Sequence, residues 1–165
     1  MPSHQPDAQA VDQVLHLFPQ PVAVIGAVRE GELGGLTAAW VTRVSVNPAL
    51  IMVAVGHERH TWHLLETAAC FSVSLLGEDQ IPVGRLFGRH SRRDRDKWAE
   101  VDHILLGDGV PALAKCCARL LCEIEGRFTA GDHDCIVGRV SMAEVVDGPP
   151  ALLMRGVDWI PGDDD

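Results

Sequence analysis

Short apolar runs broken by polar turns recur along most of this chain, and they indicate its architecture. Some runs are continuous and β-branched, as in buried strands, while others alternate apolar and polar positions, as in strands with one exposed face. Strands are therefore predicted at residues 22–28, 41–46, 50–55, 70–76, 119–128 and 134–146. The polar turn at residues 29–32, followed by Gly34-Gly35, predicts that the first strand continues into a β-hairpin.

Helical signals are fewer and shorter than strand signals. Candidate helices lie at residues 11–17, 61–67 and 78–87. Thr61 is placed to cap the start of the second, and Pro82 interrupts the third. Alternating strand–helix units are absent from the pattern, which disfavours a dinucleotide-binding α/β fold. Many strands with few short helices predict a mainly β protein, either a barrel or a sandwich.

The composition is that of one folded domain. The chain has 165 residues, of which 47% are hydrophobic, which is enough for a substantial core. Residues 1–12 are polar and are predicted to be loose, and the domain is expected to span residues 13–160. The acidic residues in 161–165 are expected to form a solvated tail.

The charge and the cysteine pattern narrow the function classes. A formal net charge of −9 and a pI near 5.2 argue against a nucleic-acid partner. The apolar runs are too short for a transmembrane helix, and the N-terminus lacks the features of a secretory signal. Five cysteines without a CxxC pair are typical of reduced thiols, so a cytoplasmic location is expected.

The stretch from Gly35 to Thr61 is the first candidate site. Small and hydroxyl residues follow Gly35 and precede an Asn47-Pro48 turn. Small residues let a flat ring approach the backbone, and hydroxyls can bond its edge. A ring with a phosphate tail describes a flavin mononucleotide (FMN), and the alternative is an ordinary pair of half-buried strands. The candidate cofactor-binding residues here are Thr37, Ala38, Ala39, Trp40, Thr42 and Ser45.

The polar turn that closes this stretch is a candidate phosphate site. Arg59 offers a charged fork, Thr61 a hydroxyl and the following helix free N–H groups, with His60 between them. The alternative is a solvated loop with a helix cap. His57, His60 and His63 also suggest a metal, but no acidic or cysteine partner follows at a useful spacing, so no metal site is predicted.

Two later segments hold further candidates. Ser91, Arg92, Lys97 and Trp98 belong to a basic string that is either a binding segment or a charged surface loop anchored by its tryptophan. His133 lies in the string GDHDCIVGRV, either as a catalytic histidine or as a histidine that satisfies turn backbone groups. Its neighbour Asp132 is expected to form the turn by bonding its own backbone.

The order of these segments resembles the flavin reductase-like, FMN-binding split-barrel family. Thr37, Ala39, Thr42, Ser45 and the Asn47-Pro48 step stand at positions of its typical Thr/Ser motif, with Asn47 in place of the usual Asp. Ser91–Trp98, the GDHD string and a closing segment at residues 151–159 follow in the same order. Arg43 and Arg92 replace a Ser and a Gly that are more usual there.

This resemblance implies a fold, a reaction and roles for the candidate residues. The fold would be an FMN-binding split β-barrel with a few short helices, usually a homodimer. The reaction would be hydride transfer from NADH or NADPH to FMN or FAD, and the partner would be a monooxygenase or another redox protein. Arg59 and Thr61 would hold the phosphate, Lys97 would meet the flavin's anionic edge or its phosphate, and His133 would stand at the nicotinamide side. The alternatives are a flavoredoxin-type electron carrier and a non-enzymatic flavin- or heme-binding module.

Overall fold

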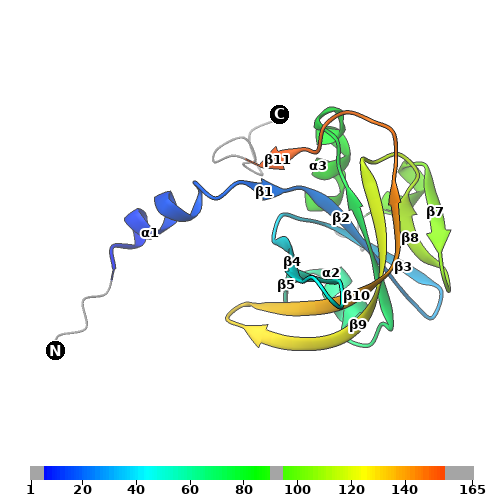
Figure 1. The fold of residues 1–165 in the computed structure, drawn as a ribbon, viewed down its shortest axis with the longest axis horizontal. Helices are drawn as coiled ribbons and strands as arrows, with labels where there is room; N and C mark the ends of the chain where they lie inside the picture. Colours follow the sequence, from blue (N-terminus) through cyan, green and yellow to red (C-terminus); the bar gives the residue numbers. More distant parts are fainter. Residues whose placement is uncertain (1–5, 90–94, 155–165) are drawn as a thin grey trace.

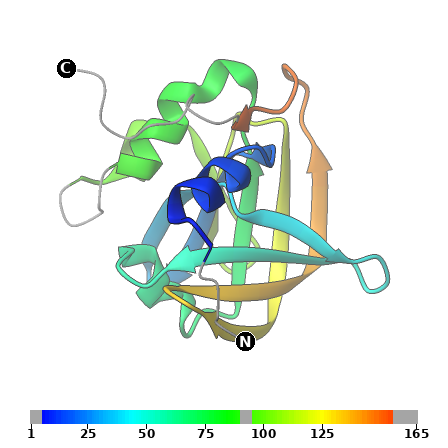
Figure 2. The same ribbon diagram turned by 90° about the vertical axis from the view of Figure 1, so that its left-hand side faces the viewer.

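The computed structural model describes residues 6–89 and 95–154, and a curled antiparallel sheet dominates them (Figure 1). The seven strands lie in the order β3-β2-β6-β9-β10-β5-β4. Figures 1 and 2 show that the sheet bends round on itself into a barrel. The strands are β2 (Ala23–Arg29), β3 (Glu32–Ala38), β4 (Val41–Ser45), β5 (Leu50–Gly56), β6 (Cys70–Leu75), β9 (Ala118–Ala130) and β10 (His133–Val145).

The two edge strands of this sheet, β3 and β4, are consecutive in the chain. A two-residue corner, Ala39-Trp40, carries the chain from one edge to the other. The Val41 N–H donates to the Ala39 carbonyl and the Ala54 N–H to the Trp40 carbonyl, both at 3.0 Å. The barrel is thus split at this corner, which confirms the predicted mainly β split-barrel fold.

Two apolar clusters support the barrel from opposite sides. The inner cluster contains the fully buried Ile25, Val53, Phe71 and Ile136, together with Leu64 and Leu65 of α2 (His60–Leu65). The outer cluster joins Val24, Phe87, Trp98 and Leu113 beneath α3 (Ile81–Arg89). Each fully buried side chain of this size stabilises the fold by about 1.5–3 kcal/mol. Successive side chains of β2 point in turn into the inner and the outer cluster, which explains why its sequence is continuously apolar.

The predicted strands are confirmed to within a few residues, and so is the first hairpin. In its turn, Glu30 and Gly31 both have positive φ, 51° and 81°, as a two-residue type I′ turn requires. Two short antiparallel pairs escaped prediction because each strand has only two to four residues. They are β1 (Gln20–Pro21) with β11 (Leu153–Met154), and β7 (His103–Leu106) with β8 (Val110–Leu113).

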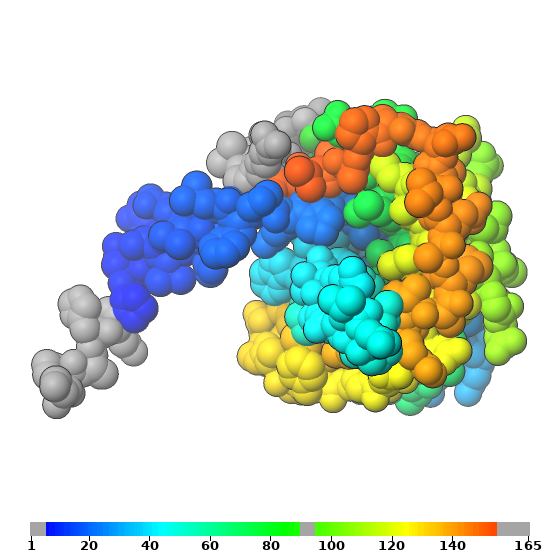
Figure 3. Space-filling view, in the orientation of Figure 1, coloured from blue at the N-terminus to red at the C-terminus, as the bar shows by residue number. Residues whose placement is uncertain are grey.

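The N-terminal helix α1 (Ala8–Leu15) begins three residues before the predicted start at residue 11. Asp7 explains the difference, because its carboxylate accepts a bond from the Gln9 N–H at 3.2 Å and caps the first turn. Part of the segment that was expected to be loose is therefore helical. None of the eight residues of α1 is buried, and the helix stands away from the barrel (Figures 1 and 3).

Two local predictions are wrong. Arg59, not Thr61, occupies the N-cap position of α2, and Thr61 lies buried inside the helix. The alternation in residues 119–128 predicts that Arg119 shares the polar face of the strand, but Arg119 is buried, where it donates to the Leu113 carbonyl at 3.0 Å and pairs with Glu144. The end of β8 and the residues after it cover that end of β9, so the Arg119 guanidinium donates to carbonyl groups of this segment.

The third predicted helix forms in two pieces, the 3₁₀ turn η1 (Glu78–Gln80) and α3. Pro82 is the second residue of α3, where a missing N–H costs no helical bond. Within residues 6–89 and 95–154, no helix is long and apolar enough to cross a membrane. All five cysteines are free thiols.

Candidate functional site

A cavity of about 230 Å³ opens where the barrel is split, beside the Ala39-Trp40 corner. Three segments that are far apart in the sequence meet there: the end of β3 with the corner, the end of β5 with the following turn, and the start of β10. The lining residues are Val22, Leu36, Thr37, Ala38, Ala39, Trp40, Ala54, Val55, Gly56, Arg59, His133 and Met154. Small side chains dominate the wall, so a flat group can lie close to the backbone.

The structure brings together most of the first candidate stretch but not all of it. Thr37, Ala38, Ala39 and Trp40 line the cavity. The Thr37 hydroxyl donates to the Gly84 carbonyl of α3 at 2.6 Å, so its oxygen is left as an acceptor. The other two candidates, Thr42 and Ser45, lie on β4 beyond the corner, outside this lining; Thr42 is exposed and Ser45 half-buried. The chain turns at Trp40, and that turn separates the two groups.

The predicted phosphate turn contributes Arg59 to the cavity. Its side chain is 53% exposed, donates to the Gly88 carbonyl at 3.2 Å and pairs with Glu58 at 3.6 Å. The other two candidates, His60 and Thr61, lie outside the cavity lining. His60 Nε2 lies 2.8 Å from a Glu32 carboxylate oxygen, and Thr61 is buried in α2.

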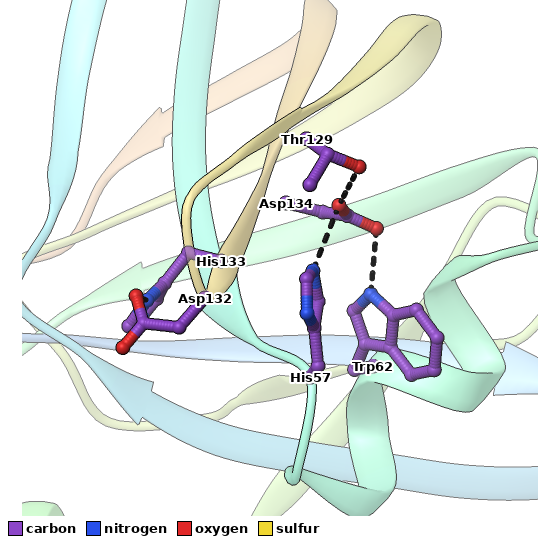
Figure 4. Close-up of polar contacts among 6 residues, drawn as sticks. All are labelled: His57, Trp62, Thr129, Asp132, His133 and Asp134. Atoms are coloured by element: carbon purple, nitrogen blue, oxygen red, sulfur yellow. Dashed lines mark hydrogen bonds and ion pairs between the residues drawn. The ribbon is translucent and has the colours of Figure 1, made fainter.

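His133 is the first residue of β10 and faces the cavity. Its Nδ1 lies 2.6 Å from the Asp132 carboxylate (Figure 4). Its ring centroid is 4.6 Å from that of Trp40. The bond to His133 lowers the pKa of Asp132, so this carboxylate is ionised at neutral pH. Asp132 was expected to form the turn by bonding its own backbone. Its carboxylate does bond its own backbone and also reaches the imidazole, while Gly131, with φ +67°, takes the left-handed position of the turn.

Asp134, which lies on the other side of the hairpin, was not among the predicted site residues (Figure 4). One of its carboxylate oxygens accepts from His57 Nε2 at 3.0 Å and Thr129 Oγ1 at 2.8 Å. The other accepts from Trp62 Nε1 at 2.7 Å. These bonds, the one from Trp62 first, lower the pKa of Asp134. A carboxylate beginning a mostly apolar strand was the signal that could have indicated this cluster.

Lys97 and Trp98 lie in the interior, not in the cavity wall. Both belong to the 3₁₀ turn η2 (Lys97–Glu100), and both are buried. Lys97 Nζ donates to the Gly35 carbonyl at 2.7 Å, and Trp98 Nε1 donates to the Gly34 carbonyl at 3.1 Å. A Cβ on Gly35 would lie 2.6 Å from the Phe87 ring. Gly35 is therefore small to admit Phe87 and Trp98, not a ligand.

The remaining candidates, Ser91 and Arg92, lie outside the described residues. Most of the closing segment at 151–159 does too, although Met154 reaches the cavity lining. In the described part of the chain, no three His, Cys, Asp or Glu side chains are grouped as metal ligands.

Comparison with known proteins gives a consistent result. Residues 15–158 match the family described as "Flavin reductase like domain". An NADH-dependent FAD reductase of Streptomyces globisporus is 33% identical over 141 residues, which are 84% of this chain and 77% of that protein. The reductase subunit HsaB of a flavin-dependent monooxygenase from Rhodococcus jostii (strain RHA1) is 30% identical, over 90% of this chain and 78% of the subunit. Some relatives are longer, and the chain covers 44% of a probable flavin reductase from Rhizobium meliloti (strain 1021).

Solved structures agree with the sequence comparison. The NADH:FAD oxidoreductase SgcE6 of Streptomyces globisporus, in complex with NAD and FAD fragments, superposes with a TM-score of 0.82 at 30% identity, with 96% of both chains covered. An FMN-binding protein from Thermus thermophilus superposes with a TM-score of 0.78 at 34% identity, covering 86% of this chain and 85% of that one. The fold, the cavity at the barrel's split and these similarities agree, and the chain belongs to the flavin reductase-like domain family.

Proposed function

We propose that this protein is an NAD(P)H-dependent flavin reductase that binds FMN in the cavity beside the Ala39-Trp40 corner. The observation that supports this best is the convergence of three distant segments on one cavity. They bring a wall of small residues, an exposed arginine and a histidine with its carboxylate partner. The small residues give room for a flat ring, and the arginine can bind a phosphate. The histidine can face the redox-active side of the ring.

The residues present fit the flavin. Ala38, Ala39, Ala54 and Gly56 leave room for a ring against the backbone. Arg59 is half exposed, and its ion pair with Glu58 is long at 3.6 Å, so its guanidinium is available to a phosphate. When bound, the flavin supplies the acceptor for a hydride from reduced nicotinamide.

His133 is the residue that we assign to the nicotinamide side of the cavity. The ionised carboxylate of Asp132 accepts a hydrogen bond from Nδ1–H, which fixes the tautomer and the orientation of the ring. Nε2 is then the nitrogen that remains for a substrate group or for charge on the reduced flavin. Trp40 packs against the same ring and limits its rotation.

The relatives favour NADH as the donor. Those from Streptomyces globisporus and Pseudomonas fluorescens are named as NADH-dependent reductases. We propose FMN as the flavin, with FAD as the second choice, because similar proteins include an FMN-binding protein and an FAD reductase. The alternative function is a flavoredoxin-type electron carrier, and the resemblance to such carriers lies in the basic string that contains Lys97 and Trp98. Both residues are buried, so the string gives that alternative no support.

We also propose two kinds of partner. Relatives that are reductase subunits of a monooxygenase and a demethylase suggest that this chain passes reduced flavin to such an enzyme.

The exposed apolar side chains on and after α1 suggest that the helix packs on a second copy of the chain. They are Val11, Val14, Leu15, Leu17 and Phe18. Light scattering of the full chain and of a chain lacking residues 1–18 would test this dimer.

The test of the function is an absorption spectrum of the purified protein, taken with and without added FMN and then in anaerobic NADH or NADPH. We expect a bound flavin spectrum that bleaches within seconds in NADH and more slowly in NADPH. A bound flavin that stays oxidised in both nucleotides would instead indicate an electron carrier. A protein whose spectrum shows no flavin after FMN is added would overturn the flavin site.

A further inference from the structure

We infer that Asp134 is a positioning residue for the reductase reaction, because its carboxylate holds the turn after β5, which contains Arg59, against the hairpin that contains His133. The inference rests on the proposed flavin site. Asp134 is adjacent to His133 on β10, and successive side chains on a strand point to opposite faces. Figure 4 shows this arrangement, with His133 and Asp132 on one side and Asp134 on the other.

Three elements donate to the Asp134 carboxylate. Trp62 Nε1 of α2 is 2.7 Å away, Thr129 Oγ1 of β9 is 2.8 Å away, and His57 Nε2 of the turn after β5 is 3.0 Å away. Bonds to an ionised acceptor are about twice as strong as bonds between neutral groups. The carboxylate thus joins the hairpin of His133 to the segment that contains the phosphate turn.

The phosphate turn is short, so the position of His57 determines that of Arg59. His57 follows Gly56 and precedes Glu58-Arg59, and its own N–H donates to the Asp132 carbonyl at 3.2 Å. The Arg59 N–H donates to the Gly56 carbonyl at 3.1 Å. Two of these residues, Gly56 and Arg59, line the cavity. Loss of the Asp134 carboxylate would release the His57 ring and let Arg59 move from its place.

The test is a double-mutant cycle on FMN affinity, read by quenching of flavin fluorescence in wild type, Asp134→Ala, Arg59→Ala and the double variant. We expect each single change to weaken binding by about 10-fold. We expect the double variant to be no weaker than Arg59→Ala, because Asp134 acts through Arg59. Multiplying losses, or normal affinity in Asp134→Ala alone, would overturn the inference. Normal affinity in Arg59→Ala would overturn the phosphate site as well.

Further variants separate positioning from general stability. Asp134→Asn retains the shape and one acceptor oxygen, so it should bind FMN more tightly than Asp134→Ala. If Asp134→Ala does not fold, the same cycle is run with Asp134→Asn. Its smaller loss of affinity should then be absent when Arg59→Ala is already present. His57→Ala should match Asp134→Ala, whereas Thr129→Val, which leaves the bond to the turn intact, should bind FMN within about 2-fold of wild type. Equal losses in His57→Ala and Thr129→Val would contradict positioning. Arg139→Ala, an exposed arginine elsewhere on β10, and Asp108→Ala are the matched controls.

Discussion

Two regions of this molecule pair a basic residue with an aromatic ring, and the barrel uses them in opposite ways. At the split, His133 packs on the half-exposed Trp40 beside a cavity. Beneath α3, Lys97 and Trp98 are buried, and their nitrogens bond to backbone carbonyls of β3. In the first pair, His133 Nδ1 contacts Asp132 and the imidazole faces the cavity, whereas the side-chain nitrogens of the second pair bond to the backbone of the fold. We therefore expect changes at the split to alter flavin chemistry and changes at the second pair to alter stability.

The largest effect on stability is expected for Trp98→Ala. The indole is 2% exposed, and its centroid lies 4.7 Å from that of Phe87. Emptying such a site costs about 3–5 kcal/mol of unfolding free energy. Urea denaturation measures this loss, and Trp98→Phe, which keeps a ring, should lose less. An unchanged midpoint with weakened FMN binding would reverse the roles of the two regions.

A smaller, pH-dependent effect is expected for Lys97→Met. Burial, aided by the charge of Arg59, lowers the pKa of Lys97 from 10.5 to about 8. Between those values the unfolded chain binds more protons than the folded one, so this residue's contribution to stability rises with pH. A shift of this size corresponds to about 3 kcal/mol at most.

The measurement is the unfolding free energy of wild type and Lys97→Met at pH 7.5 and 10.5. Wild type should gain about 3 kcal/mol relative to the variant between the two values. Taking the difference removes the cysteine titrations, which both proteins share. The exposed Lys115 provides the matched control, because Lys115→Met should show no such shift. A difference that does not change with pH would mean that Lys97 is not desolvated.

The third expected effect is on the rate of flavin reduction, and it comes from a residue at the split of the barrel. His133→Ala removes the imidazole that Asp132 orients, and we expect the rate of flavin reduction to fall by about 100-fold at saturating FMN and NADH. Stability and FMN affinity should change little, because the carboxylate that His133 contacts, Asp132, is 90% exposed and stays solvated in the variant. Stopped-flow bleaching of the flavin measures the rate, with the exposed His63→Ala as control. Equal losses of affinity and rate would make His133 a structural residue.

The fold was predictable from the sequence because its strands are long and their periodicity is clear. Strand β2 shows why, since its continuous apolar run corresponds to burial on both faces. The short pairs β1–β11 and β7–β8 were not predictable, because two to four residues do not establish a period. Arg119 was misplaced for a related reason, as its strand end is covered by a segment distant in sequence.

The site was predictable in part, and the failures have a common physical cause. His133 and Arg59 were predicted from local signals, a polar turn after one strand and a polar string before another, and both line the cavity. Asp134 was missed because its partners, His57, Trp62 and Thr129, come from three other elements. Lys97 was assigned to the cavity because sequence alone does not show which way a buried amine points. Tertiary contacts decided each of these cases.

The smallest expected effect is at Trp40, and it tests the comparison most finely. The indole is 52% exposed and its ring lies 4.6 Å from His133, so it contributes little to stability. A stacked aromatic ring contributes about 0.5–1.5 kcal/mol, so Trp40→Ala should weaken FMN binding by about 5-fold, while Trp40→Phe should bind nearly as wild type. Flavin fluorescence titration measures both. Wild-type affinity in Trp40→Ala would place the flavin ring against another wall of the cavity, and the aromatic residue at the split would then serve only to hold His133.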